Sequence, residues 1–174
     1  RMNIKTIMLT GDRRQVAAEI AAQIGIDDFR PQLLPSDKAL IVQEIQKTEK
    51  TIVAMVGDGI NDAPALSQAD VGIAIGAGAD VAIESADIVL TGKQLMDVAA
   101  AIALCRATLR VIKQNLFWAL AFNAVGIPLA AGVFTALFDG PALRPVFAAL
   151  AMACSSLAVV ANALRLRRWC PPQP

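Results

Sequence analysis

Two long stretches without a charged side chain constrain the fold of this chain more than any other feature of its sequence. The first runs from Asn115 to Phe138 and the second from Pro145 to Leu164. At about 1.5 Å per residue, each stretch is long enough as an α-helix to cross a hydrocarbon core of about 30 Å. The connection between them, residues 139–144, contains glycine and proline, which favour a turn. The sequence therefore predicts a helical transmembrane hairpin.

Basic residues flank both outer sides of the predicted hairpin. They are Arg106, Arg110 and Lys113 before the first stretch, and Arg165, Arg167 and Arg168 after the second. By the positive-inside rule, this distribution places both ends of the hairpin, and so both chain ends, on the cytoplasmic side. We therefore expect an integral membrane protein of the inner or plasma membrane. The alternative interpretation is a very apolar pair of soluble helices.

The charges divide the chain into two parts. Residues 1–104 hold 9 basic and 14 acidic side chains, whereas residues 105–174 hold 7 basic and 1 acidic. We therefore expect one domain over residues 1–104 and a membrane domain over residues 105–174, with spans at about 115–138 and 145–164. The overall charge of only +1 argues against a partner nucleic acid, and the lack of histidine excludes a histidine base. Three widely spaced cysteines do not indicate a disulfide framework.

In the first part, apolar runs alternate with segments of helical spacing. The predicted strands are 6–9, 52–56, 71–75 and 88–90, and the predicted helices are 16–24, 36–46 and 61–69. Ser36 is the expected N-cap of the second helix, and Gly25 is the expected end of the first. Strands that alternate with helices indicate a Rossmann-like parallel sheet in an α/β domain.

The polar residues of this domain gather where predicted strands end. Thr10 follows the first strand, while Asp58 and Asp62 follow the second on one glycine-containing turn. In an open α/β sheet, ligands bind beyond the carboxyl ends of the strands. Paired carboxylates suit Mg²⁺, which prefers oxygen ligands. Lys38 lies near a predicted helix N-terminus, where a cation gains nothing from the helix dipole, and this position suggests that the lysine serves a phosphate.

Three motifs together resemble the phosphorylation domain of P-type ATPases, which belong to the haloacid dehalogenase superfamily. They are Thr10-Gly11-Asp12, Pro35-x-x-Lys38 and the ten-residue string Gly-Asp-Gly-Ile-Asn-Asp-Ala-Pro-Ala-Leu at 57–66. The resemblance continues through residues 115–123, 152–156 and 162–166, which look like the last two membrane helices of the heavy-metal subgroup, nearest the copper(I) exporters. It covers essentially the whole chain and implies a partial haloacid dehalogenase-like domain followed by the hairpin.

The resemblance implies roles for particular residues. For the reaction with ATP and Mg²⁺ it implies that Asp58 and Asp62 ligate the metal, that Asn61 and Asp62 order the loop, that Thr10 and Lys38 hold phosphoryl oxygens, and that Thr10, Gly11 and Asp12 lie at the nucleotide. For the transported copper it implies a site that contains Asn123, Met152 and Ser156. A thioether is a suitable soft ligand for Cu(I).

Several parts of such a pump are absent from this sequence. The phosphorylated aspartate, the actuator and nucleotide-binding domains and the Cys-Pro-Cys helix have no counterpart here. We therefore expect a C-terminal piece that is inactive alone, with the remainder of the pump, the lipid bilayer and a copper donor protein as partners. Phe122 replaces the usual tyrosine beside Asn123, so Cu(II) and Zn(II) stay open as alternative ions. The rival functions are a membrane-anchored phosphatase of the haloacid dehalogenase type and a non-catalytic fragment.

Overall fold

The computed structural model describes residues 2–58, 60–76, 84–92, 94–132 and 145–170. The chain divides into two compact units, Arg1–Val98 and Ala99–Pro174. The described elements of the first unit are β1 (Ile7–Leu9), α1 (Arg14–Ile24), β2 (Asp28–Arg30), α2 (Pro35–Glu49), β3 (Ala54–Gly57), the 3-10 turn η1 (Ile60–Asp62), α3 (Ala63–Gln68), β4 (Val71–Ile75) and β5 (Ile88–Leu90). The helix α5 (Met96–Ala130) begins in this unit and continues into the second, which also contains α7 (Pro145–Leu164) and the 3-10 turn η2 (Arg165–Arg168).

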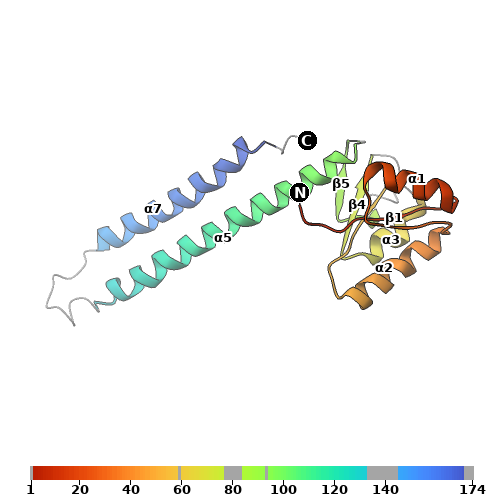
Figure 1. Cartoon of the computed structure of the whole chain (residues 1–174). Helices are drawn as coiled ribbons and strands as arrows, with labels where there is room; N and C mark the ends of the chain where they lie inside the picture. The colour runs from red at the N-terminus through yellow and green to blue at the C-terminus, as the bar shows by residue number, and fades with distance from the viewer. Residues whose placement is uncertain (1, 59, 77–83, 93, 133–144, 171–174) are drawn as a thin grey trace. The chain divides into compact units, whose positions relative to one another are not determined.

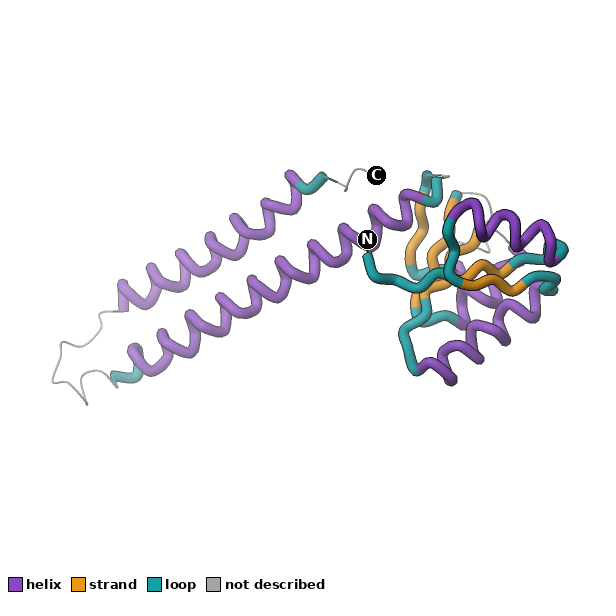
Figure 2. The backbone as a smooth tube through the Cα atoms, in the orientation of Figure 1, coloured by secondary structure: helices purple, strands orange, loops and turns teal. Residues whose placement is uncertain are grey.

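The strand pairs that the structure describes in the first unit are all parallel, which confirms the predicted parallel α/β architecture. β1 pairs with β2, and β3, β4 and β5 form a second sheet in that order. Figure 2 shows the strands of this unit with helices around them. The described strands thus form two small sheets, where the alternation of elements predicted one.

β2 is a strand that sequence reasoning missed. Its three residues include one apolar side chain, Phe29, so no run of hydrophobic residues marks it. Tertiary contacts define it instead: the Asp28 amide donates to the Thr6 carbonyl at 3.2 Å, and the Thr6 amide donates to the Asp27 carboxylate at 2.7 Å. A strand this short forms because its partner lies beside it.

The core of the first unit lies between α2, α3 and β3. Val42, Met55, Ala65 and Leu66 are buried together, and Leu9 of β1 packs against them. The burial of these apolar side chains stabilises the packing of α2 and α3 against the strands. This core fixes the end of β3 and the first turn of α2 in one region.

The start of α2 differs from the predicted start. The helix begins at Pro35 with Leu34 as its N-cap, so the N-cap expected at Ser36 is wrong. Pro35 occupies the first helical position, where a missing N–H costs nothing, and the Leu34 amide donates to the Asp37 carboxylate at 2.9 Å. The predicted end of α1 is confirmed, because Gly25 adopts a left-handed conformation with φ of 68°.

In the second unit, α5 and α7 lie side by side and run in opposite directions (Figure 1). The Asn162 side chain on α7 donates to Asn115 on α5 at 2.8 Å, and to Gln114 at 3.4 Å. The bounds of α7 equal the second expected span, whereas residues 133–138 of the first expected span lie outside the described residues. Among the residues that the structure describes, no helix is both long enough and apolar enough to cross a membrane.

Candidate functional site

An ion pair joins the first turn of α2 to the turn after β3. Lys38 Nζ donates to Asp62 Oδ1 at 2.7 Å, and the two side chains are only 17% and 11% exposed. Two sequence motifs separated by 24 residues therefore meet at one point. Because Asp62 compensates the charge of Lys38, the lysine is stable near a helix N-terminus, where the helix dipole alone opposes it.

Gly57 leaves room for this carboxylate. A Cβ atom at position 57 would lie 2.7 Å from the Cβ of Asp62 and 2.8 Å from its Oδ2. Real Cβ atoms do not approach other atoms so closely, so only glycine permits the turn as it stands. The glycine that ends β3 therefore positions Asp62 by its lack of a side chain.

Two residues of the loop after β1, Thr10 and Asp12, form hydrogen bonds with each other. The Thr10 hydroxyl donates to Asp12 Oδ2 at 2.8 Å, and the Asp12 amide donates back to Thr10 Oγ1 at 3.1 Å. This reciprocal pair holds the Thr10 hydroxyl at the carboxyl end of β1. Asp12 is exposed, whereas Thr10 is partly buried.

The β1 loop is also tied to the segment that leads into α2. The Leu33 amide donates to the Thr10 carbonyl at 3.1 Å, and the Gln32 amide donates to the Asp12 carbonyl at 2.9 Å. Lys38 follows in the first turn of that helix. The loop after β1, the start of α2 and the turn after β3 thus form one connected region, which we call the strand-end site. Its members with predicted roles are Thr10, Gly11, Asp12, Lys38 and Asp62.

Asp58 and Asn61 belong to the same turn, and both are exposed. Among the described residues there is no cluster of three or more carboxylate, cysteine or histidine side chains that could hold a metal by itself. Mg²⁺ does not require such a cluster, since it is usually bound by one or two carboxylates together with substrate phosphates and water. The exposed Asp58 carboxylate fits this mode, while Asp62 Oδ1 is engaged with Lys38.

The residues expected to bind the transported ion are not enclosed. Met152 is 71% exposed, and Ser156 and Asn123 are exposed as well. The Ser156 hydroxyl donates to the Met152 carbonyl at 3.2 Å, which places the two residues one turn apart on one face of α7. Because Ser156 acts as the donor in this bond, the lone pairs of its oxygen can still bind a metal ion. A complete ion site on this face requires further segments to cover it.

Two further carboxylates stabilise the first unit away from the strand-end site. The Val53 amide, at 2.8 Å, and the Gln46 side-chain amide, at 3.0 Å, lower the pKa of Asp70 below its ordinary value. The Thr6 amide and hydroxyl lower the pKa of Asp27 in the same way. Both carboxylates are charged at neutral pH and fasten the starts of strands.

Sequence reasoning missed two contributors to the strand-end site. They are Gly57, which leaves room for Asp62, and Asp37, whose carboxylate accepts a hydrogen bond from the amide of the N-cap residue Leu34. A signal for Asp37 existed, because an acidic residue three positions after the N-cap is a common helix start. No sequence signal reports the contact at Gly57, which depends on how the turn folds back on β3.

The chain is similar to known proteins over nearly its whole length. Residues 1–70 match the family of haloacid dehalogenase-like hydrolases. A probable copper-exporting P-type ATPase of Archaeoglobus fulgidus is 53% identical over 99% of this chain, and copper-transporting ATPase 2 of Mus musculus is 51% identical over 98%. The chain spans 21% and 12% of these two relatives.

A solved structure agrees with this similarity. The crystal structure of a zinc-transporting PIB-type ATPase matches with a TM-score of 0.78 and 41% identity, over 95% of this chain and 26% of that one. A catalytic CPx-ATPase domain, CopB-B, matches with a TM-score of 0.50 and 36% identity over 55% of this chain.

Proposed function

We propose that this chain is part of an ATP-driven pump that exports Cu(I) or Ag(I). The basis of the proposal is homology with the heavy-metal P-type ATPases over nearly the whole length of the chain. The chain spans about a fifth of its first relative, so the remainder of the pump supplies the other parts of the reaction. These parts are the phosphorylated aspartate, the actuator and nucleotide-binding domains and the Cys-Pro-Cys helix. The pump works through an aspartyl-phosphate.

The observation that supports this proposal most directly is the Lys38–Asp62 pair. It brings a cation, a carboxylate and the exposed Asp58 to the carboxyl end of β3, where α/β folds bind ligands. In the proposed pump, Lys38 would donate to a phosphoryl oxygen, and the Thr10 hydroxyl would do the same after turning away from Asp12 Oδ2. Asp58 would ligate Mg²⁺ with its exposed carboxylate. Asp62 holds Lys38 in place and, with Asn61, orders the loop. Bound Mg²⁺ supplies positive charge that offsets the charge of the phosphoryl group.

We also propose how the remainder of the pump joins the first unit. β1 and β3 belong to different sheets, yet Leu9 of β1 and Met55 of β3 pack at the same core. An additional strand supplied by the remainder would pair with both sheets and carry its aspartate between Thr10 and Asp58. Such a strand completes the strand-end site, and this explains why the chain is expected to be inactive alone.

Membrane placement of α5 and α7 is part of the proposal. The two uncharged stretches and their basic flanks support a hairpin with both ends in the cytoplasm, in the inner or plasma membrane. The exposed Met152, Ser156 and Asn123 then face the missing helices, which enclose the ion.

The proposed ion is Cu(I), because the available ligands carry no negative charge. Relatives named for copper are 53% identical to this chain, whereas the matched zinc transporter is 41% identical. A site with one thioether and two neutral oxygens suits a monovalent soft ion better than a divalent one, which requires an anionic ligand in an apolar setting.

The experiment that tests this proposal uses the full-length protein. We expect Asp58→Asn to abolish acid-stable labelling by γ-labelled ATP while Ag(I) binding is kept, because the metal at the phosphoryl group is lost and the ion site is untouched. Glu44→Gln, which removes an exposed carboxylate on α2, is the matched control and should label normally. Normal labelling of the Asp58→Asn protein would contradict the assignment.

A second experiment separates the rival functions. The 174-residue chain alone is expected to hydrolyse neither ATP nor simple phosphate esters and to take up no label, since it lacks the nucleophile. Phosphatase activity of this chain would favour the membrane-anchored phosphatase instead.

A further inference from the structure

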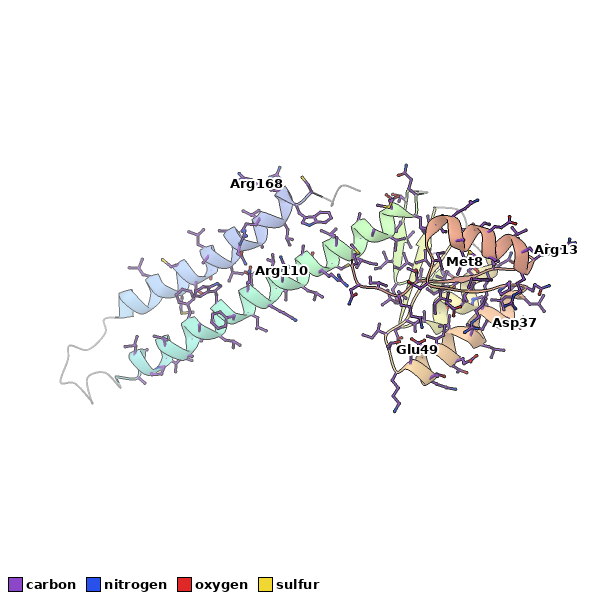
Figure 3. The ribbon with its side chains drawn as sticks, viewed as in Figure 1. Met8, Arg13, Asp37, Glu49, Arg110 and Arg168 are labelled. Atoms are coloured by element: carbon purple, nitrogen blue, oxygen red, sulfur yellow. The ribbon has the colours of Figure 1, made fainter. Side chains whose placement is uncertain are left out.

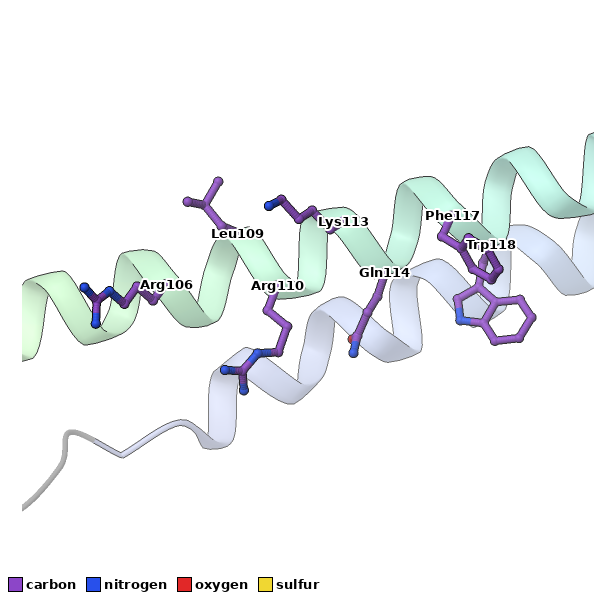
Figure 4. A pocket seen from close by; sticks show the side chains of 7 residues that line it. All are labelled: Arg106, Leu109, Arg110, Lys113, Gln114, Phe117 and Trp118. Carbon is purple, nitrogen blue, oxygen red and sulfur yellow. The ribbon is translucent and has the colours of Figure 1, made fainter. Parts of the chain in front are cut away.

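A basic pocket lies on the middle of α5, in the second unit. It has a volume of about 540 Å³, which is within the range of roughly 300–1,000 Å³ that organic ligands occupy. Its lining residues are Arg106, Leu109, Arg110, Lys113, Gln114, Phe117 and Trp118 (Figure 4). We call this feature the α5 pocket.

The cations of the α5 pocket fall on one stripe of the helix. At about 100° per residue, positions 106, 110, 113 and 117 lie within roughly 60° of one another. Figure 4 shows the Arg110 and Gln114 side chains extending from the same edge of α5, with the indole of Trp118 beyond them. Phe117 belongs to the same stripe, whereas Trp118 lies to one side of it and completes the lining of the pocket.

In the second unit no acidic side chain lies among the described residues, so none there balances Arg110 and Lys113. Asp139 is the only acidic residue of the sequence from 99 to 174, and it lies outside the described residues. Arg110 and Lys113 are exposed, and Figure 3 shows Arg110 on α5 and another cation, Arg168, in η2 after α7. A pocket with this charge attracts an anionic ligand.

The surface changes from cationic to apolar along α5. After Lys113 the helix exposes Leu116, Phe117, Trp118 and Leu120, each more than half exposed. The Phe117 and Trp118 rings meet edge to face, with centroids 5.5 Å apart, at the boundary. Aromatic rings at such a boundary are typical of proteins at the headgroup level of a membrane.

We propose that the α5 pocket binds the headgroup of an anionic phospholipid, with Arg110 and Lys113 at the phosphate and the acyl chains along the apolar surface beyond Trp118. The order of chemistry along the helix favours a lipid over a free anion, because a free anion gains nothing from the exposed apolar side chains. Basic pockets on the cytoplasmic side of membrane helices are known to bind such headgroups. This inference rests on the membrane placement in the proposed function.

The test uses the tryptophan that lines the pocket as its probe. The Trp169→Phe chain has Trp118 as its only tryptophan, and it is placed in phosphatidylcholine nanodiscs that contain a fixed minor fraction of brominated lipid. We expect brominated phosphatidylglycerol to quench Trp118 more strongly than brominated phosphatidylcholine at the same fraction. Arg110→Gln with Lys113→Gln should reduce the relative affinity for phosphatidylglycerol about tenfold or more, from roughly 1 kcal/mol for each cation.

Matched controls distinguish the pocket from general charge attraction. Arg14→Gln with Lys47→Gln removes the same charge from exposed positions of the first unit and should leave the preference unchanged. Equal quenching by the two labelled lipids, or an unchanged preference in the Arg110/Lys113 variant, would overturn the proposal. Loss of the preference when inorganic phosphate replaces chloride at constant ionic strength would assign the site to free phosphate and overturn it too.

The readout also separates this inference from the proposed function. No quenching by either lipid would show that α5 does not enter the bilayer, which contradicts the membrane placement itself. Quenching without a preference would contradict only the lipid site, and a pump without this site would still form its phosphoenzyme.

Discussion

Replacing Gly57 with alanine tests how the strand-end site is held together. The new Cβ atom would lie 2.7 Å from the Asp62 Cβ. Carbon atoms in contact normally lie about 3.5–4.0 Å apart, so the overlap is close to 1 Å. Overpacking of this kind costs about 1–3 kcal/mol, and displacement of Asp62 also weakens its mostly enclosed pair with Lys38. We expect a loss of about 2–4 kcal/mol in the free energy of unfolding of the first unit.

Native-state amide hydrogen exchange is the suitable assay, because it reports the stability of the first unit separately from the long helices. The buried Met55 and Leu66 are good reporters, since they belong to the core beside the turn. Gly126→Ala is the matched control. A Cβ atom at position 126 meets nothing within 4 Å, so exchange in the first unit should not change.

A double-mutant cycle identifies the cause of the loss. In an Asp62→Gly background the atoms that the new Cβ would meet are gone, so the Gly57→Ala change should cost less than about 1 kcal/mol there. Equal costs of Gly57→Ala in the two backgrounds would refute the steric argument and leave the role of this glycine to its backbone freedom.

Three further predictions concern other parts of the chain. The folded-state pKa of Asp70 lies below its ordinary value of 3.8, so the stability that this carboxylate contributes is present above pH 3.8 and is lost as the pH falls through the lower folded-state pKa. In the Asp70→Asn variant, the urea midpoint of the first unit should therefore depend less on pH in this acid range. In the full-length pump, Met152→Ala should lower the apparent Ag(I) affinity about tenfold or more, and Cys154→Ala, on another face of α7, should not; equal effects would contradict the ligand assignment. Asn162→Leu removes the hydrogen bonds that this side chain donates to Asn115 and Gln114 on α5, and it should speed amide exchange in the last turns of α7, whereas Asn123→Leu should leave that exchange unchanged.

Local features of the fold were predictable because they depend on neighbours in the sequence. The bounds of β4, β5 and α7 equal the predicted ones, since each is a mostly apolar run without a charged side chain and with clear ends. Gly25 ends α1 as predicted, because glycine adopts the left-handed conformation without strain. The motif residues of the strand-end site were recognisable for the same reason, although their proposed roles stay predictions.

Contacts between distant segments were decided only by the tertiary structure. Hydrophobic periodicity reports which face of an element is buried but does not name the partner of that face. Hence β2, the division into two sheets and the 2.7 Å pair of Lys38 with Asp62 did not follow from the pattern. The pair exists because the core around Val42 and Leu66 sets α2 against the turn after β3, and because Gly57 gives the carboxylate room.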